Sequence, residues 1–307
     1  MTQLTAQEVL AHVQAGKTLK QAELSAVDLS GLSLDSGDFS DAYLRRALFV
    51  EASCQRANFS GATLIMSALR ATNLQKAVLV NAVLTHAHLE HADMGDANAS
   101  GAKFYGAFLE GIRGVAAVLN EADFREVTGS EACFDDASAV GTSFNRASLT
   151  ASSFLRANLV RSHWNEAVLI QCSFREANLE RATFCQSNLS NADFSDANSL
   201  NADFKSANLS GATLANAQLD WAHLIEAKLT GANCQKASLF NTDLTGADLS
   251  QANFAGANLQ DACLENAQLA GTQFEESNVS GALFTDAVGL SDEQRTWLKA
   301  QGALNVA

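Results

Sequence analysis

A single five-residue period runs without insertion or deletion from Leu24 to Phe284, a span of 53 units. Leu or Phe occupies 43 of the 53 central positions, and two residues before the centre there are 38 Ala and 11 Ser, Thr, Cys or Gly. The stretch 247–254 (ADLSQANF) shows the unit as A-(D/N)-(L/F)-x-x. This period matches neither a helix nor a strand, so we expect a chain that turns every five residues. Each unit then directs one large and one small side chain inward.

The spacing of the central Phe residues predicts how many units close one coil. Between positions 104 and 204 they form two sets that step by twenty, or by forty across Trp164, and the sets are offset by ten. The two sets are 104, 124, 144, 184 and 204, and 134, 154, 174 and 194. We therefore predict a square coil of four units, with Phe rings stacked from coil to coil on two opposite sides.

The repeat closely resembles that of the pentapeptide-repeat family over roughly residues 22–287. The resemblance implies an all-β fold, a right-handed quadrilateral parallel β-helix. The 53 units make about 13 coils, on the order of 63 Å of solenoid at a strand spacing of about 4.8 Å. The chain contains no Pro, which fits this fold because Pro removes an amide needed for bonding between coils.

Short capping helices are expected on either side of the repeat. We predict a lead-in and capping helix within residues 1–21, the β-helix over 22–287, and a capping helix within 288–307. Thr5 is a candidate N-cap of the first helix, and 291–294 (SDEQ) has the spacing of a capping box. Some family members dimerise through their C-terminal ends, so a homodimer is a further expectation. The candidate end-cap or dimer contacts are Trp297, Leu298 and Leu304.

Five central positions hold small residues: Ala99, Gly114, Gly129, Ala139 and Ser199. Three of them are followed at once by an apolar residue, namely Val115, Val140 and Leu200. We expect a local bulge that turns this neighbour inward. A hinge or bend is one interpretation of these positions, and tolerated cavities are the other, which we favour.

Outward positions supply two candidate binding surfaces. Large apolar residues and arginines fall on one corner line, a composition typical of protein-interface hot spots; the candidate patch is Val160, Arg161, Arg181, Leu200, Trp221 and Phe240. From Ala237 to Ser291 there is no Lys or Arg. The acidic residues of that stretch form a candidate DNA-mimicking surface: Asp243, Asp248, Asp261, Glu265, Glu275, Glu276 and Asp286.

The sequence predicts no catalytic, cofactor or metal site. The six Cys follow the repeat rather than any ligand spacing: Cys54, Cys172 and Cys234 at inward positions, Cys133, Cys185 and Cys263 at outward ones. The outward directions of His86, His88 and His91 differ within one coil, so they should not converge on a metal. A column of packed side chains also leaves no room for a substrate. We therefore expect a protein that is not an enzyme.

Charge and resemblance together define two function hypotheses. The 20 Lys and Arg against 34 Asp and Glu give a net charge of −14, which argues against direct binding to nucleic acid or to an anionic membrane. The first hypothesis is a protein–protein interaction scaffold, because a rigid repeat rod with capped ends and its own surface patch suits an adaptor. Residues 16–34 look similar to pentapeptide proteins that accompany bacterial secretion machinery, which implies a link of this scaffold to that machinery. The second is a DNA mimic that inhibits or protects DNA gyrase or topoisomerase IV, as several family members do. Lacking a secretion leader and a C-x-x-C motif, the protein is expected in the bacterial cytoplasm.

Overall fold

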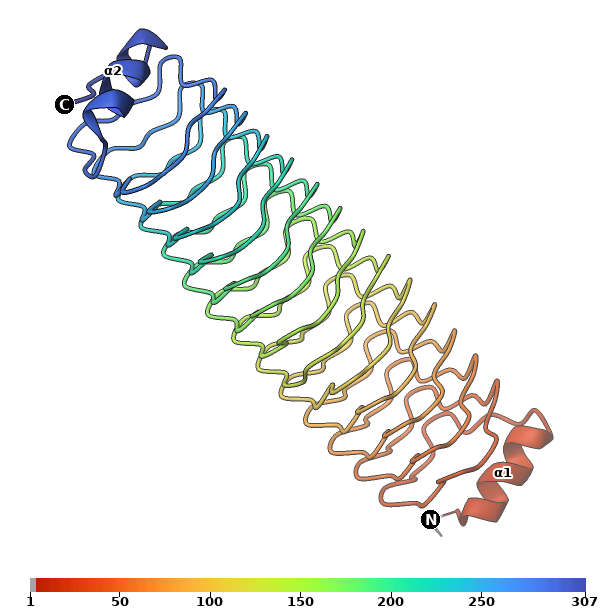
Figure 1. The fold of residues 1–307 in the computed structure, drawn as a ribbon. Coiled ribbons are helices and arrows are strands. Elements are labelled where there is room, and N and C mark those ends of the chain that lie inside the picture. Colours follow the sequence, from red (N-terminus) through yellow and green to blue (C-terminus); the bar gives the residue numbers. More distant parts are fainter. Residues whose placement is uncertain (1–3) are drawn as a thin grey trace. The chain divides into compact units, whose positions relative to one another are not determined.

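The computed structural model describes residues 4–307. The chain divides into two compact units, one up to Asn158 and one from Leu159 onward, and each is described by itself. Both are built from the predicted coil, the right-handed quadrilateral parallel β-helix (Figure 1). In each unit the coils stack through parallel pairing of equivalent residues, so the fold class predicted from the repeat is confirmed.

Pairing between coils has a constant offset of twenty residues. Glu23 forms a parallel β-bridge with Tyr43, and Tyr43 forms the next with Thr63. The strands are single bridged residues, each directly before the centre of a five-residue unit. Four units therefore make one coil, as the Phe spacing predicts. We name the four sides by their central residues: side I contains position 24 and every twentieth residue after it, side II position 29, side III position 34 and side IV position 39.

Four of the five amides in a unit donate to backbone carbonyls. Around Leu24, its own amide donates to Tyr43 O at 2.8 Å, and Ala26 N donates to Arg45 O at 2.8 Å. Tyr43 N donates back to Ala22 O at 2.9 Å, and Val27 N closes the turn on Leu24 O at 3.2 Å. The third residue of each turn has a positive φ, at every fifth position from 21 to 286, as in a type II turn.

The fifth amide, which follows the central residue, is bonded by a side chain in many units. Ser30 N donates to the Asp28 carboxylate at 3.0 Å, and Ser190 N donates to the Asn188 amide oxygen at 3.2 Å. In other units the acceptor comes from the preceding coil, as when Cys185 N donates to Asn165 at 3.0 Å. The frequent Asp or Asn before the centre therefore completes the hydrogen bonding of its own turn.

The interior of each unit is a column of Leu, Phe and Ala side chains. Phe rings stack along sides I and III: Phe104 and Phe124 lie 4.4 Å apart in the first unit, and Phe184 and Phe204 lie 5.0 Å apart in the second. Rings from the two sides also meet edge to face, as between Phe124 and Phe134 at 6.0 Å. The predicted stacking of Phe from coil to coil is confirmed, and it fills the centre of the coil with aromatic contacts.

The expected inward bulge at Val115, Val140 and Leu200 is wrong. All three remain half-buried at outward positions, while Gly114, Ala139 and Ser199 keep the central positions. A one-residue slip would break the hydrogen-bond ladder on both neighbouring coils, and the ladder is uninterrupted there. At Gly114 the missing side chain is replaced by the ring of Phe134, whose Cδ1 lies 2.7 Å from where a Cβ would stand.

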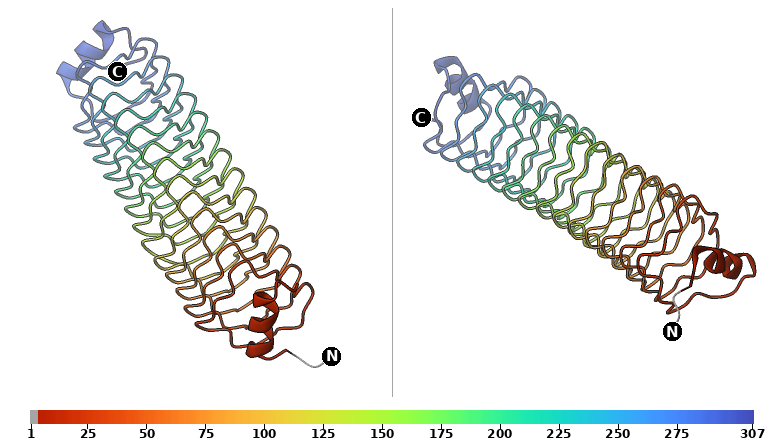
Figure 2. Two further views of the ribbon diagram at one scale, coloured as in Figure 1. Left: turned by 90° about the vertical axis from the view of Figure 1, so that its right-hand side faces the viewer. Right: turned by 90° about the horizontal axis from the view of Figure 1, so that it is seen from below.

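Helix α1 (Ala6–Gln14) lies against the first coils of its unit (Figure 2). Thr5 caps it, and the Thr5 amide donates to the Glu8 carboxylate at 2.8 Å. Val9 is fully buried, so this helix covers the open end of the coil stack as predicted. Over the described residues 4–307, no helix has the length and apolar character needed to cross a lipid bilayer.

Helix α2 (Asp292–Ala300) begins with the predicted capping box of Ser291 and Gln294. Leu298 is completely buried, Trp297 is half-buried, and Leu304 is 49% exposed. After α2 the chain returns to the coil, where Leu304 forms a parallel bridge with Leu283. Leu298 therefore covers the last coil, whereas Leu304 continues the outward register and leaves its side chain toward solvent.

Candidate protein-binding surfaces

The structure brings together all six residues of the apolar and arginine patch. They lie on the corner between sides IV and I, in the unit that begins at Leu159. Backbone bonds of 2.9 Å connect successive coils there: Arg161 N to Glu180 O, Arg181 N to Leu200 O, and Trp221 N to Phe240 O. We call this surface the corner patch: Val160, Arg161, Arg181, Leu200, Trp221 and Phe240.

Trp221 and Phe240 form the aromatic part of the corner patch. Their ring centroids lie 5.7 Å apart at 85°, and Trp221 is 51% exposed. Asp220 fixes the backbone beneath them, because its carboxylate accepts the Phe240 amide at 3.0 Å and the Ser238 hydroxyl. The pair is thus held in an edge-to-face arrangement before any partner arrives, which lowers the entropy lost on binding.

The two arginines of the corner patch lie on the coils that precede the Trp221 and Phe240 pair. Arg161 and Arg181 are exposed, and Arg181 Nε lies 3.8 Å from the Glu180 carboxylate. An exposed ion pair at this distance contributes little stability and leaves the guanidinium able to exchange partners. Trp and Arg, both present in the corner patch, are among the residue types that dominate binding energy at protein interfaces.

The predicted acidic residues do not share one surface. Asp243 lies on side I and Asp248 on side II, so their carboxylates point in different directions. The other five fall on three corners: Asp261 between sides IV and I, Glu265 and Asp286 between I and II, Glu275 and Glu276 between III and IV.

Two of these carboxylates serve the backbone. Asp243 accepts the Thr245 amide at 3.0 Å, and Asp248 accepts the Ser250 amide at 3.0 Å. Burial of Asp248 opposes its ionisation, but hydrogen bonds from Ser250 and Thr230 outweigh it and lower the pKa. Lys228 of the preceding coil pairs with Asp248 through the backbone, and its positive charge also lowers the pKa of Asp248, so a cation lies beside the acidic stretch.

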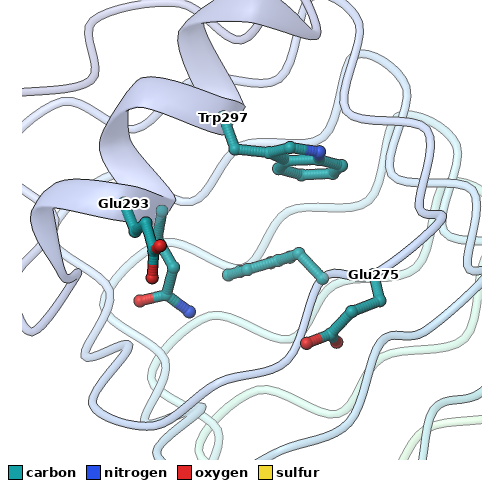
Figure 3. A pocket seen from close by; sticks show the side chains of 5 residues that line it. Glu275, Glu293 and Trp297 are labelled. Carbon is teal, nitrogen blue, oxygen red and sulfur yellow. The ribbon is translucent and has the colours of Figure 1, made fainter.

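A small pocket separates α2 from the last coil. Its volume is about 210 Å³, and Phe274 and Gln294 belong to its lining. Figure 3 shows Trp297 and Glu293 on α2 facing Glu275 across this pocket. The Gln294 side chain donates to Thr272 O at 2.6 Å, which ties the helix to the coil. The pocket is a gap beneath a docked helix, with carboxylates at its rim.

The cysteines lie where the repeat predicts. Cys54, Cys172 and Cys234 are buried, and Cys133, Cys185 and Cys263 are half-buried. Burial raises the pKa of Cys234 to about 12. Burial, followed by the hydrogen bond and charge of Asp203, raises the pKa of Cys185 to about 11. Thiolates, the reactive form, are therefore scarce at neutral pH.

We expect Cys185 to react with iodoacetamide at pH 7.5 about a hundredfold more slowly than in the unfolded chain, because burial raises its pKa to about 11 and so lowers the thiolate fraction. The rate should rise about tenfold per pH unit up to about pH 11. Peptide mass spectrometry after timed alkylation measures this, with urea-unfolded protein as the control. Equal rates in folded and unfolded protein would contradict the assignment.

The three close histidines have separate partners. His86 packs edge to face on Tyr105, His88 stacks on Phe108 at 4.5 Å, and His91 lies against Gly111. Across the described part of the chain, no group of three or more His, Cys, Asp or Glu is arranged to hold a metal ion.

Sequence reasoning missed a surface hollow at Gly129 on side II. Its volume is about 380 Å³, and Glu90, Phe108 and Glu110 are among the residues that line it. The turn after Gly129 is open: Ala132 N donates to the Ser152 hydroxyl at 3.1 Å, where a regular unit would use the carbonyl at the centre. The sequence signal for this hollow is Gly129 at a central position, but whether such a glycine leaves a hollow depends on the side chains of the adjacent coils.

Comparison with known proteins supports the repeat architecture. The family model described as pentapeptide repeats (8 copies) matches residues 38–75, 77–113, 152–191, 165–198, 201–233, 217–254 and 232–269, together more than half of the chain. No significant match was found among curated protein sequences.

Three solved structures illustrate the likeness. The fluoroquinolone resistance protein QnrB1 is 19% identical, with 70% of this chain and 94% of that chain covered and a TM-score of 0.42. HetL from the cyanobacterium Nostoc sp. strain PCC 7120 is 24% identical, with 92% and 97% covered and a TM-score of 0.20. A protein from the Arabidopsis thaliana thylakoid lumen is 37% identical, with 33% and 78% covered and a TM-score of 0.20.

The family model and the coil geometry agree on the same unit, from the period of five to the pairing offset of twenty. Together they establish that this chain belongs to the pentapeptide-repeat family.

Proposed function

We propose that this protein is a non-enzymatic protein–protein interaction scaffold that binds its partner through the corner patch. The observation that carries the proposal is the half-exposed Trp221, held against Phe240 on a rigid backbone ladder. A large aromatic group left in water on a monomer is typical of a surface that a partner covers.

Several features of the second unit support this surface. The corner patch extends from Val160 to Phe240 over four coil steps, on the order of 19 Å at the usual strand spacing. Its residues follow one line, so a partner would contact them with a single extended edge. Arg161 and Arg181 favour an acidic segment in that partner, next to an apolar contact for Trp221.

The second candidate function, mimicry of duplex DNA toward gyrase or topoisomerase IV, rests on the net charge of −14. DNA presents an anion about every 1.7 Å of axis on a continuous surface. The acidic stretch distributes its carboxylates over several sides and uses two of them within turns. We therefore favour the scaffold and keep gyrase as the comparison in the test.

A homodimer through the C-terminal end and a location in the bacterial cytoplasm complete the proposal. The exposed Leu304 and Val288 offer apolar surface for a second copy. Six cysteines that follow the repeat, with no C-x-x-C motif, fit a reducing compartment.

We expect Trp221→Ala to weaken partner binding by about 2 kcal/mol or more, since exposed Trp residues are frequent hot spots. Photo-crosslinking from position 240, in cells of the native host, identifies the bound protein; titration calorimetry then measures the loss. Val168→Ala is the matched control, because Val168 is also exposed but lies off the corner.

Unchanged affinity in Trp221→Ala would exclude the corner patch as the binding surface. A gyrase supercoiling reaction with and without a fluoroquinolone distinguishes the second candidate. DNA mimicry would be favoured if micromolar protein inhibits or protects gyrase, if Trp221→Ala keeps this effect, and if Asp261→Asn and Glu265→Gln abolish it.

A further inference from the structure

The hollow at Gly129, in the unit that ends at Asn158, has a defined physical origin. Gly129 occupies a central position of side II, where most units place Leu or Phe. An added Cβ would stand 2.7 Å from the Leu109 carbonyl carbon and 2.8 Å from Glu110 N. A side chain at Gly129 would therefore collide with the backbone of the preceding coil, and Gly129 is half-buried whereas the other central residues are buried. The surface hollow of about 380 Å³ lies here, where no side chain fills the central position.

The walls of the hollow combine one aromatic ring with two carboxylates. Phe108 is 39% exposed, and His88 stacks on one face of its ring with a centroid distance of 4.5 Å and an interplanar angle of 9°. On the other side, the backbone of Phe108 pairs with that of Thr128. Threonine is too small to cover a phenyl face. The uncovered part of the Phe108 ring therefore borders the hollow, beside Glu90 and Glu110.

The two carboxylates carry negative charge and have acceptor capacity. Hydrogen bonds from Ser130 lower the pKa of Glu110. Partial burial of Glu90 opposes its ionisation, but bonding to its own amide and to His88, with the charges of His88 and Arg70, gives a lowered pKa. Both His88 at 3.1 Å and Arg70 at 3.6 Å approach Glu90 Oε1. Among the described residues, Glu90 Oε2 is buried and has no hydrogen-bond partner.

We propose that the Gly129 hollow binds the guanidinium group of an arginine on a partner protein. A planar guanidinium can lie against the exposed ring of Phe108, beside the carboxylates of Glu90 and Glu110, which supply negative charge and acceptor oxygens. An ammonium group would supply one point charge and no flat face for the ring. None of the residues that line the hollow is basic, and Arg70 and His88 approach only the Oε1 atom of Glu90.

This inference goes beyond the corner patch, since it concerns the other unit and different residues. It describes a second contact, in which the partner presents a basic side chain. Failure of the Trp221 experiment would leave it standing, and its own failure would leave the corner patch untouched.

The test uses the full-length protein with Nα-acetyl-arginine amide as the probe. Spectra of protein with ¹³C-labelled Phe rings should show a saturable shift of the Phe108 signals, with a dissociation constant on the order of 1 mM. Nα-acetyl-lysine amide should bind several-fold more weakly. Glu90→Gln should weaken arginine binding about tenfold, because a charge-assisted hydrogen bond is lost.

Glu51→Gln is the matched control. Glu51 lies on the same corner column, outside the hollow, and its replacement removes one charge in the same way. It should leave probe binding unchanged. Thr128→Arg places a guanidinium beside the hollow from within the chain, and should abolish probe binding while the spectrum of the core Phe rings persists.

Three results would overturn the proposal. Equal binding of the lysine and arginine probes would reduce the effect to general charge attraction. Equal weakening by Glu90→Gln and Glu51→Gln would do the same. Displacement of the probe by an equal concentration of calcium chloride would identify a cation site instead of an arginine site.

Discussion

Thr213→Pro is expected to destabilise the second unit by about 3 kcal/mol or more, while Ala215→Pro, two residues later, should change stability little. Thr213 N donates to Ala192 O at 2.9 Å in the ladder between coils, so Pro removes that bond. Its ring also crowds the preceding coil. Both side chains are half-buried and outward, so the contrast isolates the backbone.

Ala215 occupies the position whose amide lies outside the backbone ladder. It is the second residue of a turn that Ala217 N closes on Leu214 O at 3.1 Å, with φ of +58° at Asn216. Pro is common at the second position of type II turns, because its fixed φ suits that site. Urea unfolding followed by circular dichroism measures both variants. Equal losses would mean that Pro is excluded for a reason other than ladder bonding.

Phe184→Ala is expected to lower the free energy of unfolding by about 3–5 kcal/mol, the cost of deleting a fully buried aromatic side chain. The Phe184 ring stacks on Phe204 at 5.0 Å and on Trp164 at 5.8 Å. It also meets Phe174 and Phe194 edge to face, at 5.7 Å and 6.0 Å. Contacts on two sides of the coil are lost together, so neighbouring coils cannot close the cavity without moving their own rings.

Phe240→Ala is the control for this prediction. Phe240 is half-buried on the corner, and its main contact is the exposed Trp221. Its removal should cost about 1 kcal/mol or less. Hydrogen exchange of amides near Phe184 should show where stability is lost, since a solenoid couples each coil mainly to its neighbours. A loss below about 1 kcal/mol for Phe184→Ala would contradict the role of the aromatic column.

Most of the fold could be predicted because the five-residue register is never interrupted. Each side chain then has a fixed direction, and the spacing of Phe124 and Phe144 by twenty gives the number of units per coil. The helix caps could also be predicted, because Thr5 and Ser291 each begin a short capping pattern that depends only on neighbouring residues.

Features that depend on neighbouring coils were not predictable from a single unit. Gly114 and Gly129 hold equivalent positions in the repeat, yet the Phe134 ring fills the space at Gly114, whereas at Gly129 a Cβ would meet the backbone of the preceding coil. The positions of the corner-patch residues along one corner follow from the sequence, because placing them needs only the register. The sequence does not show that the Asp243 and Asp248 carboxylates accept backbone amides of their own turns, because an outward position alone suggests a carboxylate that faces solvent.

The constant pairing offset bears on how such a chain can change its length. Duplicating twenty residues adds a whole coil, so every side, including a surface like the corner patch, continues in line. Duplicating one five-residue unit leaves the backbone bonding of each coil intact but rotates all later side chains by a quarter turn. A genetic slip of fifteen nucleotides would therefore preserve the fold while cutting a binding surface into two halves that face different directions.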